Sequence, residues 1–199
     1  MPLDVDQDQR REDVARVAAK LVAERGMAAV TFRNLASEMS CSTTAISHYF
    51  DSRNAILAET YRFVVARASA RRVPPPGADA RARLASIDQI LPLDRQNWDD
   101  WVVWLCFWTE ALFNPELARL QKEYSRDGRR IIEELLQSLG CRSEMAHDLS
   151  QKVMTTIYGI AIQAAFDSEF WTPAAQRAAL DEVLQPVLAL IDGGSPATP

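Results

Sequence analysis

An all-α fold is predicted for this chain of 199 residues. Apolar residues recur every three or four positions along most of the sequence, which is the spacing of one helical face. The chain has only 7 glycines, and it lacks runs in which apolar and polar residues alternate strictly, as strands require. Two long periodic segments open on a capping residue followed by proline, Asn114-Pro115 and Thr172-Pro173.

Three short helices are predicted first. The first helix covers residues 9–25 and ends at Gly26, because glycine just past a helix end is a common stop. Its apolar face is formed by Val14, Val17, Ala18, Leu21 and Val22. Thr31 is the expected N-cap of a second helix over 32–39. After a turn at Ser40 and Cys41, a third helix is expected over 42–50, with the sequence S-T-T-A-I-S-H-Y-F.

Longer helices follow. Ser52 is the expected N-cap of a fourth helix over 53–72, and the run P-P-P-G at 74–77 interrupts the chain after it. Five further helices are predicted over 78–91, 97–113, 115–139, 144–167 and 173–191. The expected organisation is a helix-turn-helix DNA-binding domain over 1–52, joined by the long fourth helix to an effector-binding and dimerisation domain over 53–199.

The second and third helices indicate DNA binding. Two short helices with a tight turn, braced by a preceding helix, form a helix-turn-helix unit, whose second helix enters the major groove. Base contacts are therefore expected from the hydroxyl-bearing residues of the third helix, Ser42, Thr43, Thr44 and Ser47. Their hydroxyls donate or accept, and threonine methyls can contact thymine methyls. Arg33 on the second helix is the best candidate to read guanine.

Four further residues are candidate phosphate ligands. Thr31 and Arg53 lie at helix N-termini, where backbone N–H groups favour anions, and His48 and Tyr49 can donate to phosphate oxygens. Such contacts set register without reading sequence. The simpler alternative is structural: a polar short helix can be an ordinary solvated one, Thr31 can be only a cap, and Tyr49 can pack between helices.

Bulk properties exclude several classes. The net charge of -5 argues against nucleic-acid binding over the whole surface, but it allows a local basic face. No apolar run approaches the roughly 20 residues of a membrane span, and the N-terminus lacks the apolar core of a secretory signal. Three scattered cysteines, Cys41, Cys106 and Cys141, show no metal-ligand or disulfide spacing. A cytoplasmic protein without membrane association, metal or cofactor is expected.

Catalysis is not predicted. The two histidines, His48 and His147, have no acid or nucleophile at a recognisable spacing, and no phosphate loop, G-x-S-x-G or H-E-x-x-H is present. The alternative to a DNA-binding regulator is a helical adaptor without DNA readout, which explains the composition but not S-T-T-A-I-S-H-Y-F. A thiol sensor at Cys41, beside the third helix, is a further hypothesis; an inert cysteine is the simpler interpretation.

One helix carries four of the five tryptophans, Trp98, Trp101, Trp104 and Trp108, within about a third of its circumference. Core packing is the simplest interpretation. The alternative is a small-molecule site, because aromatic faces attract quaternary ammonium groups by about 0.5–2 kcal/mol per good contact. Glu110 on the same helix and Glu123 on the next are nearby charges.

Residues 10–57 resemble the N-terminal domain of the TetR family of bacterial repressors. The matching residues are Gly26, Thr31, Arg33, Leu35, Ala36, Ser42, Ile46, His48, Tyr49, Phe50, Ile56 and Leu57. The resemblance implies a homodimeric repressor that a ligand releases from a pseudo-palindromic double-stranded operator. The chain has Ser40 where the family usually has glycine, Thr44 where glycine is common, and Arg53 where lysine is frequent. If the turn needs positive φ at Ser40, a non-glycine residue costs about 1–2 kcal/mol.

The segment 101–126 is also similar to the matching part of the choline-responsive BetI-type repressors. This resemblance implies an effector such as choline, another cationic amine or a relative. The candidate effector-binding residues are Trp101, Trp104, Phe107, Trp108, Tyr124 and Tyr158. Tyr158 stands where the BetI-type pattern often has an acidic residue.

The last two helices, 144–167 and 173–191, are the predicted homodimer interface, as a four-helix arrangement of two protomers. They carry apolar residues on more than one side: Val153, Ile157, Ile160, Ala161, Ala164, Ala165, Leu180, Val183, Leu184, Val187 and Leu188. Two recognition helices about one DNA turn apart need a dimer. The alternative is that this surface is covered within the monomer.

Overall fold

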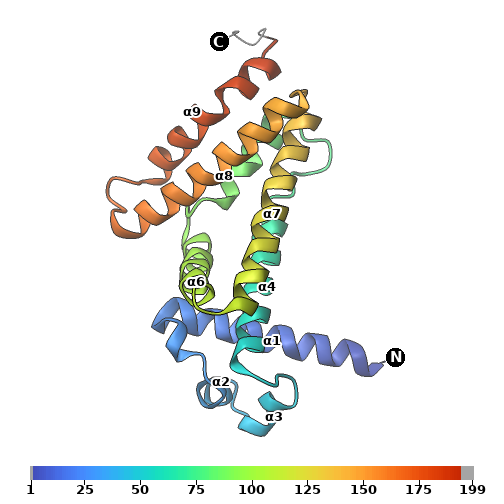
Figure 1. The fold of residues 1–199 in the computed structure, drawn as a ribbon, viewed down its shortest axis with the longest axis vertical. Coiled ribbons are helices and arrows are strands. Elements are labelled where there is room, and N and C mark those ends of the chain that lie inside the picture. The colour runs from blue at the N-terminus through green and yellow to red at the C-terminus, as the bar shows by residue number, and fades with distance from the viewer. Residues whose placement is uncertain (1, 194–199) are drawn as a thin grey trace. The chain divides into compact units, whose positions relative to one another are not determined.

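The computed structural model describes residues 2–193, with side chains from residue 7 onward. Within that range the chain is all-α and contains no strand (Figure 1), which confirms the predicted fold class. No helix in the described part is long and apolar enough to cross a membrane. The elements are α1 (Pro2–Arg25), η1 (Met27–Ala29), α2 (Phe32–Glu38), α3 (Thr43–Ser47), α4 (Arg53–Arg71), α5 (Ala80–Ala85), η2 (Ser86–Ile90), α6 (Arg95–Ala111), α7 (Pro115–Ser138), α8 (Ser143–Phe166) and α9 (Pro173–Ile191).

Three predicted elements differ from the structure. α1 begins at Pro2 rather than at residue 9. α3 is shorter than 42–50, because Ser42 is its N-cap and Tyr49 and Phe50 follow its end. The single helix predicted over 78–91 is wrong: α5 ends at Ala85 and the chain continues as the 3₁₀ helix η2. The carbonyls of Gln89 in η2 and of the extended Leu91 after it accept hydrogen bonds from the buried Asn97 side chain of α6, at 3.2 and 3.0 Å, which holds the end of η2 in place.

The described chain forms two compact units. Unit 1 comprises the residues up to 70 together with 98–121, and unit 2 comprises 71–97 together with the residues from 122 on. The unit boundaries fall within α4, near the start of α6 and within α7. Each unit has its own buried apolar residues, so each is described by itself.

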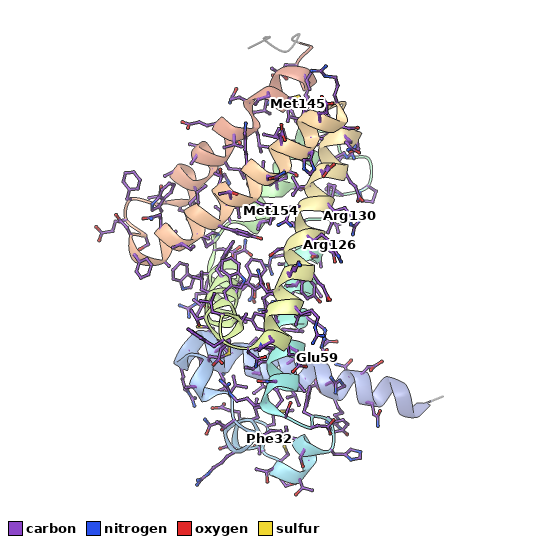
Figure 2. All side chains as sticks on the ribbon, in the orientation of Figure 1. Phe32, Glu59, Arg126, Arg130, Met145 and Met154 are labelled. Atoms are coloured by element: carbon purple, nitrogen blue, oxygen red, sulfur yellow. The ribbon has the colours of Figure 1, made fainter. Side chains whose placement is uncertain are left out.

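In unit 1, Arg11 fixes the end of the helix-turn-helix to α4. Its Nη1 donates to the backbone oxygen of Tyr49 at 2.6 Å, and its Nη2 donates to Oε2 of Glu59 at 2.9 Å. Its guanidinium also lies 4.4 Å from the ring centroid of the buried Phe50. Figure 2 labels Glu59 on α4 and Phe32 at the start of α2. One arginine therefore orients the residues that follow α3.

In unit 2, α8 packs along α9 and close to α7. A Cβ at Gly128 of α7 would lie 3.3 Å from Cε of Met154, which Figure 2 labels on α8. Glycine at this position therefore allows the close approach of α7 to α8. Two ion pairs connect the α5–η2 segment to α9 or its end: Arg81 with Asp192 at 2.6 Å, and Arg177 with Asp88 at 2.9 Å.

Most of the apolar residues predicted to form the dimer interface are covered within the chain itself. The buried ones are Val153, Ile157, Ile160, Ala161, Ala164, Leu180, Leu184 and Val187. Ala165, Val183 and Leu188 are half-buried. The alternative of cover within the monomer therefore holds for the larger part of this surface. A different stripe of α8 is exposed, formed by Thr155, Gly159, Ile162 and Phe166.

Candidate DNA-binding and effector sites

Both helices of the helix-turn-helix begin at a hydroxyl cap. Thr31 Oγ1 accepts from the backbone N of Asn34 at 3.1 Å, and Ser42 Oγ accepts from that of Ala45 at 3.1 Å. The predicted cap at Thr31 is therefore confirmed, and Ser42, predicted to lie inside the third helix, is a second cap. The Asn34 side chain donates in addition to the Ala29 oxygen at 2.9 Å, which fixes α2 against the preceding η1.

The turn between α2 and α3 has the backbone geometry of a Schellman motif. Ser40 N donates to the Ser37 oxygen at 3.2 Å, and Cys41 N donates to the Ala36 oxygen at 2.9 Å. The residue at the centre of this motif needs the left-handed conformation, and Ser40 has φ 53°. The position where the family usually has glycine therefore does require positive φ here.

Eight of the nine predicted DNA contacts lie on or next to α2 and α3, and Arg53 is the first residue of α4. Six of the nine residues are exposed: Arg33, Ser42, Thr43, Thr44, Ser47 and His48. Thr31, Tyr49 and Arg53 are half-buried. The Tyr49 ring packs edge-on against His48, with centroids 5.1 Å apart. Two of the hydroxyl groups already make hydrogen bonds within the protein: Ser47 Oγ donates to the Thr44 oxygen at 3.1 Å, and Ser42 caps α3.

Arg53 makes contacts that the sequence did not indicate. Its Nε donates to the Val30 oxygen at 3.1 Å, and its Nη2 donates to the Met27 oxygen at 2.8 Å. The same Nη2 donates to Oε1 of Glu110 on α6 at 3.1 Å. The guanidinium thus joins η1, the chain leading to α2, and α6. Its phosphate contact stays a prediction.

Three of the α6 tryptophans form a cluster. The Trp101 ring meets those of Trp104 and Trp108 edge-on, at centroid distances of 4.7 and 6.0 Å and interplanar angles of 82° and 87°. Trp101 is buried, whereas the other two are half-buried. The Phe107 ring stacks on Tyr61 of α4 at 3.9 Å and 13°, and both rings are buried. Phe107 therefore packs α6 against α4 in the core.

A buried carboxylate on the same helix was missed. Asp100 is 0% exposed and pairs with Arg67 of α4, whose guanidinium lies 5.0 Å from the ring centroid of Phe63. Unit 1 therefore already holds a cation between a carboxylate and an aromatic ring. A signal was available, because Asp100 stands four residues before Trp104 and so shares its helical face.

The remaining two predicted effector residues, Tyr124 and Tyr158, belong to unit 2 and are half-buried. Burial raises the pKa of the Tyr158 phenol, while a hydrogen bond with Ser125 and the positive charge of Arg129 oppose that shift. The phenol therefore stays protonated around neutral pH and can donate a hydrogen bond. The structure thus divides the six predicted effector residues between the two units.

Sequence profiles of two families match the chain. The family described as bacterial regulatory proteins, tetR family, matches residues 15–60, and the one described as BetI-type transcriptional repressor, C-terminal, matches residues 80–189. The chain belongs to the TetR family. It is a ligand-responsive, DNA-binding transcriptional regulator with a BetI-type C-terminal domain. The helix-turn-helix derived above lies inside the first match, and α6 to α8 lie inside the second.

Curated TetR-family relatives and solved structures agree with this assignment. The regulator BetI of Paraburkholderia xenovorans is 28% identical over 181 residues, which is 87% of this chain and 91% of that protein. BetI of Stenotrophomonas maltophilia is 32% identical over 117 residues, or 57% of this chain and 60% of that protein. A transcriptional regulator from Rhodococcus sp. superposes with a TM-score of 0.79 at 25% identity, over 95% of this chain and 99% of its own. A putative regulator from Saccharomonospora viridis in complex with choline superposes with a TM-score of 0.78 at 29% identity, over 89% of this chain and 96% of its own.

Proposed function

We propose that this TetR-family protein is a homodimeric repressor that a small quaternary ammonium compound, such as choline, releases from a pseudo-palindromic operator. Residues 1–52 bind the operator, and residues 53–199 bind the effector and dimerise. The residues assigned to DNA are those of the α2–α3 surface, with Arg33 as base reader and the hydroxyls of α3 as weaker readers.

The tryptophan cluster of α6 carries the effector assignment. The three rings meet edge-on at 4.7 and 6.0 Å, and aromatic faces gathered in this way are the chemistry that attracts an ammonium group. The buried carboxylate of Asp100, next to Trp101 on the same helix, is already paired with Arg67. The guanidinium of Arg67, held by Asp100 and Phe63, supports the idea that this region stabilises cations.

The indole N–H of Trp104 indicates that the ligand carries a hydrogen-bond acceptor. Its indole Nε1 is buried, and no acceptor lies within hydrogen-bond reach among the residues the structure describes. A buried donor without an acceptor is uncommon and calls for an explanation. A ligand that carries a hydroxyl next to its ammonium group, as choline does, would supply that acceptor. The choline complex of the similar Saccharomonospora viridis regulator supports the same class of ligand.

The test compares choline with its neutral isostere 3,3-dimethyl-1-butanol, which has the same shape without the charge. Choline is expected to quench or shift tryptophan fluorescence and to weaken operator binding in a gel shift, whereas the isostere is expected to do neither. Equal binding of both compounds, or choline binding without operator release, contradicts the proposal. Trp104→Leu should weaken choline binding by about 2- to 30-fold, as the loss of one cation–π contact implies. Trp171→Leu, in the α8–α9 connection, is the matched control and should bind choline normally.

A further inference from the structure

We propose that Arg53 and Glu110 form the joint through which the tryptophan helix α6 controls the position of the recognition unit. This inference rests on the proposed function, because it concerns how effector occupancy reaches the operator-binding surface. All the contacts that carry it lie within unit 1.

On the DNA-binding side, the Arg53 guanidinium holds two backbone oxygens that precede α2. Its donors reach Met27 O at 2.8 Å and Val30 O at 3.1 Å. Met27 is buried, Val30 is fully buried, and the next residue is Thr31, the N-cap of α2. A displacement of the guanidinium therefore acts directly on the start of α2, and α2 carries α3 through the hydrogen-bonded turn at Ser40.

On the effector side, the same guanidinium is bound to α6. Arg53 Nη2 donates to Glu110 Oε1 at 3.1 Å, with both side chains about equally covered. Glu110 lies two residues after Trp108 on a continuous helix. Because an α-helix rises about 1.5 Å per residue, Glu110 is roughly 9 Å along the axis from Trp104 and moves with it as one rod.

A second contact runs parallel to this ion pair. Burial raises the pKa of the Cys106 thiol, and a hydrogen bond from the Met27 backbone opposes that shift. Cys106 and Glu110 are one turn apart on α6. Two side chains on one face of α6 thus meet the same backbone segment, Glu110 through Arg53 and Cys106 directly.

The guanidinium is what makes the joint possible. Arginine offers several donors in a rigid planar fork, whereas lysine offers one compact ammonium group on a flexible stem. Nε and Nη2 of Arg53 here donate to three acceptors, on η1, on the chain leading to α2 and on α6. Lysine would retain the positive charge close to DNA but could not hold these acceptors in one fixed geometry. Lysine is frequent at this position in the family. Arginine therefore matters here because it couples α6 to the start of α2, and not because it carries a positive charge.

The experiment separates coupling from binding with two variants and a control. Arg53→Lys keeps the charge and removes the fork, and Glu110→Gln keeps the shape and removes the charge. Glu116→Gln makes the same charge change on an exposed residue in the first turn of α7. For each protein, choline affinity is measured by tryptophan fluorescence, and operator affinity is measured with and without saturating choline.

In the wild-type protein, saturating choline should lower operator affinity by about 5- to 150-fold, the usual range of allosteric coupling. Both joint variants should bind choline within about twofold of wild type, and the effect of choline on operator affinity should fall to about threefold or less. The control should behave as wild type. If either joint variant retains the full wild-type effect, the inference is overturned.

A reciprocal measurement keeps the inference distinct from the choice of effector. Coupling is mutual, so operator binding should change the fluorescence of the α6 tryptophans, measured in a Trp171→Phe background. Glu110→Gln should abolish that change. If choline has no effect on the wild-type protein, the proposed effector class fails. The fluorescence change on operator binding then still tests whether Arg53 and Glu110 form the joint. If that change persists in Glu110→Gln, the inference is overturned.

Discussion

Ser40 holds a backbone conformation that L-residues adopt at a cost. Its φ of 53° lies in the left-handed region, where Cβ comes too close to the following carbonyl oxygen. The conformation persists because two backbone hydrogen bonds, to Ser37 O and Ala36 O, close the end of α2 around it. This strain is located in the turn that sets the angle between α2 and α3.

Ser40→Gly is expected to stabilise the protein by about 1 kcal/mol, because glycine adopts positive φ without the Cβ clash. Urea unfolding monitored by circular dichroism should show a higher midpoint at an unchanged slope. The matched control is Ser37→Gly in the last turn of α2, where the residue is helical, and it should lose up to about 1 kcal/mol. A lower midpoint for Ser40→Gly would mean that the serine side chain contributes more than the strain costs.

Among the residues assigned to DNA, Arg33 has an exposed guanidinium, whereas Arg53 is half-buried. Arg33→Ala should cost about 1–3 kcal/mol for the cognate operator and less for unrelated DNA, since a base contact is lost. Competition binding with operator variants at fixed salt measures the change in sequence preference. Lys20→Ala, an exposed charge on α1, is the control. An unchanged preference in Arg33→Ala would assign this residue to the phosphate backbone.

At the scale of elements, helix starts were predictable because their signals are local. Thr31, Ser42, Ser52 and Thr172 each accept a hydrogen bond from a backbone N–H three residues ahead, at 3.1 to 3.3 Å. The sequence carries such a signal within four residues of the helix start. The bounds of α7, α8 and α9 accordingly agree with prediction to within one residue.

Elements whose form depends on distant residues were not predictable. Asn97 of α6 donates its side-chain amide to the carbonyls of Gln89 and Leu91 and so holds the end of η2. The apolar pattern over 78–91 contains no trace of those bonds. The stack of Phe107 on Tyr61 and the pairing of Asp100 with Arg67 likewise join α6 to α4 across 33 residues or more. The aromatic face was therefore predictable, but its division between core support and exposed lining was not.

At the scale of the whole molecule, one glycine has no explanation inside the chain. Gly128 has a close neighbour on α8, since a Cβ there would lie 3.3 Å from Cε of Met154. A Cβ at Gly159, in the middle of α8, would meet nothing within 4 Å among the described residues. Glycine in a helix interior costs about 1 kcal/mol relative to alanine. Close approach of a partner protomer at this position would offset that cost.

The exposed stripe around Gly159 has the composition of such an interface. Ile162 is 38% exposed and Phe166 is 87% exposed on the same side of α8. Pro186, Glu182 and Val183 of α9 border a groove with Thr155 and Lys152 of α8. Small and apolar residues at the centre with charged ones beside them are typical of subunit contacts. The proposed dimer therefore uses the outer face of α8 and α9, and not the buried residues that the apolar pattern of the sequence predicted.

Gly159→Gln is expected to convert the dimer into monomers, because the longer side chain fits the open space of one protomer but blocks a second helix. Light scattering coupled to size exclusion should report half the wild-type mass, with unchanged or higher helix content by circular dichroism. Gln137→Ala, an exposed substitution on α7, should leave the mass unchanged. Because two recognition helices must bind successive major grooves together, the monomer should lose specific operator binding while still binding choline. A Gly159→Gln protein that keeps its dimer mass would exclude this face of α8 from the interface.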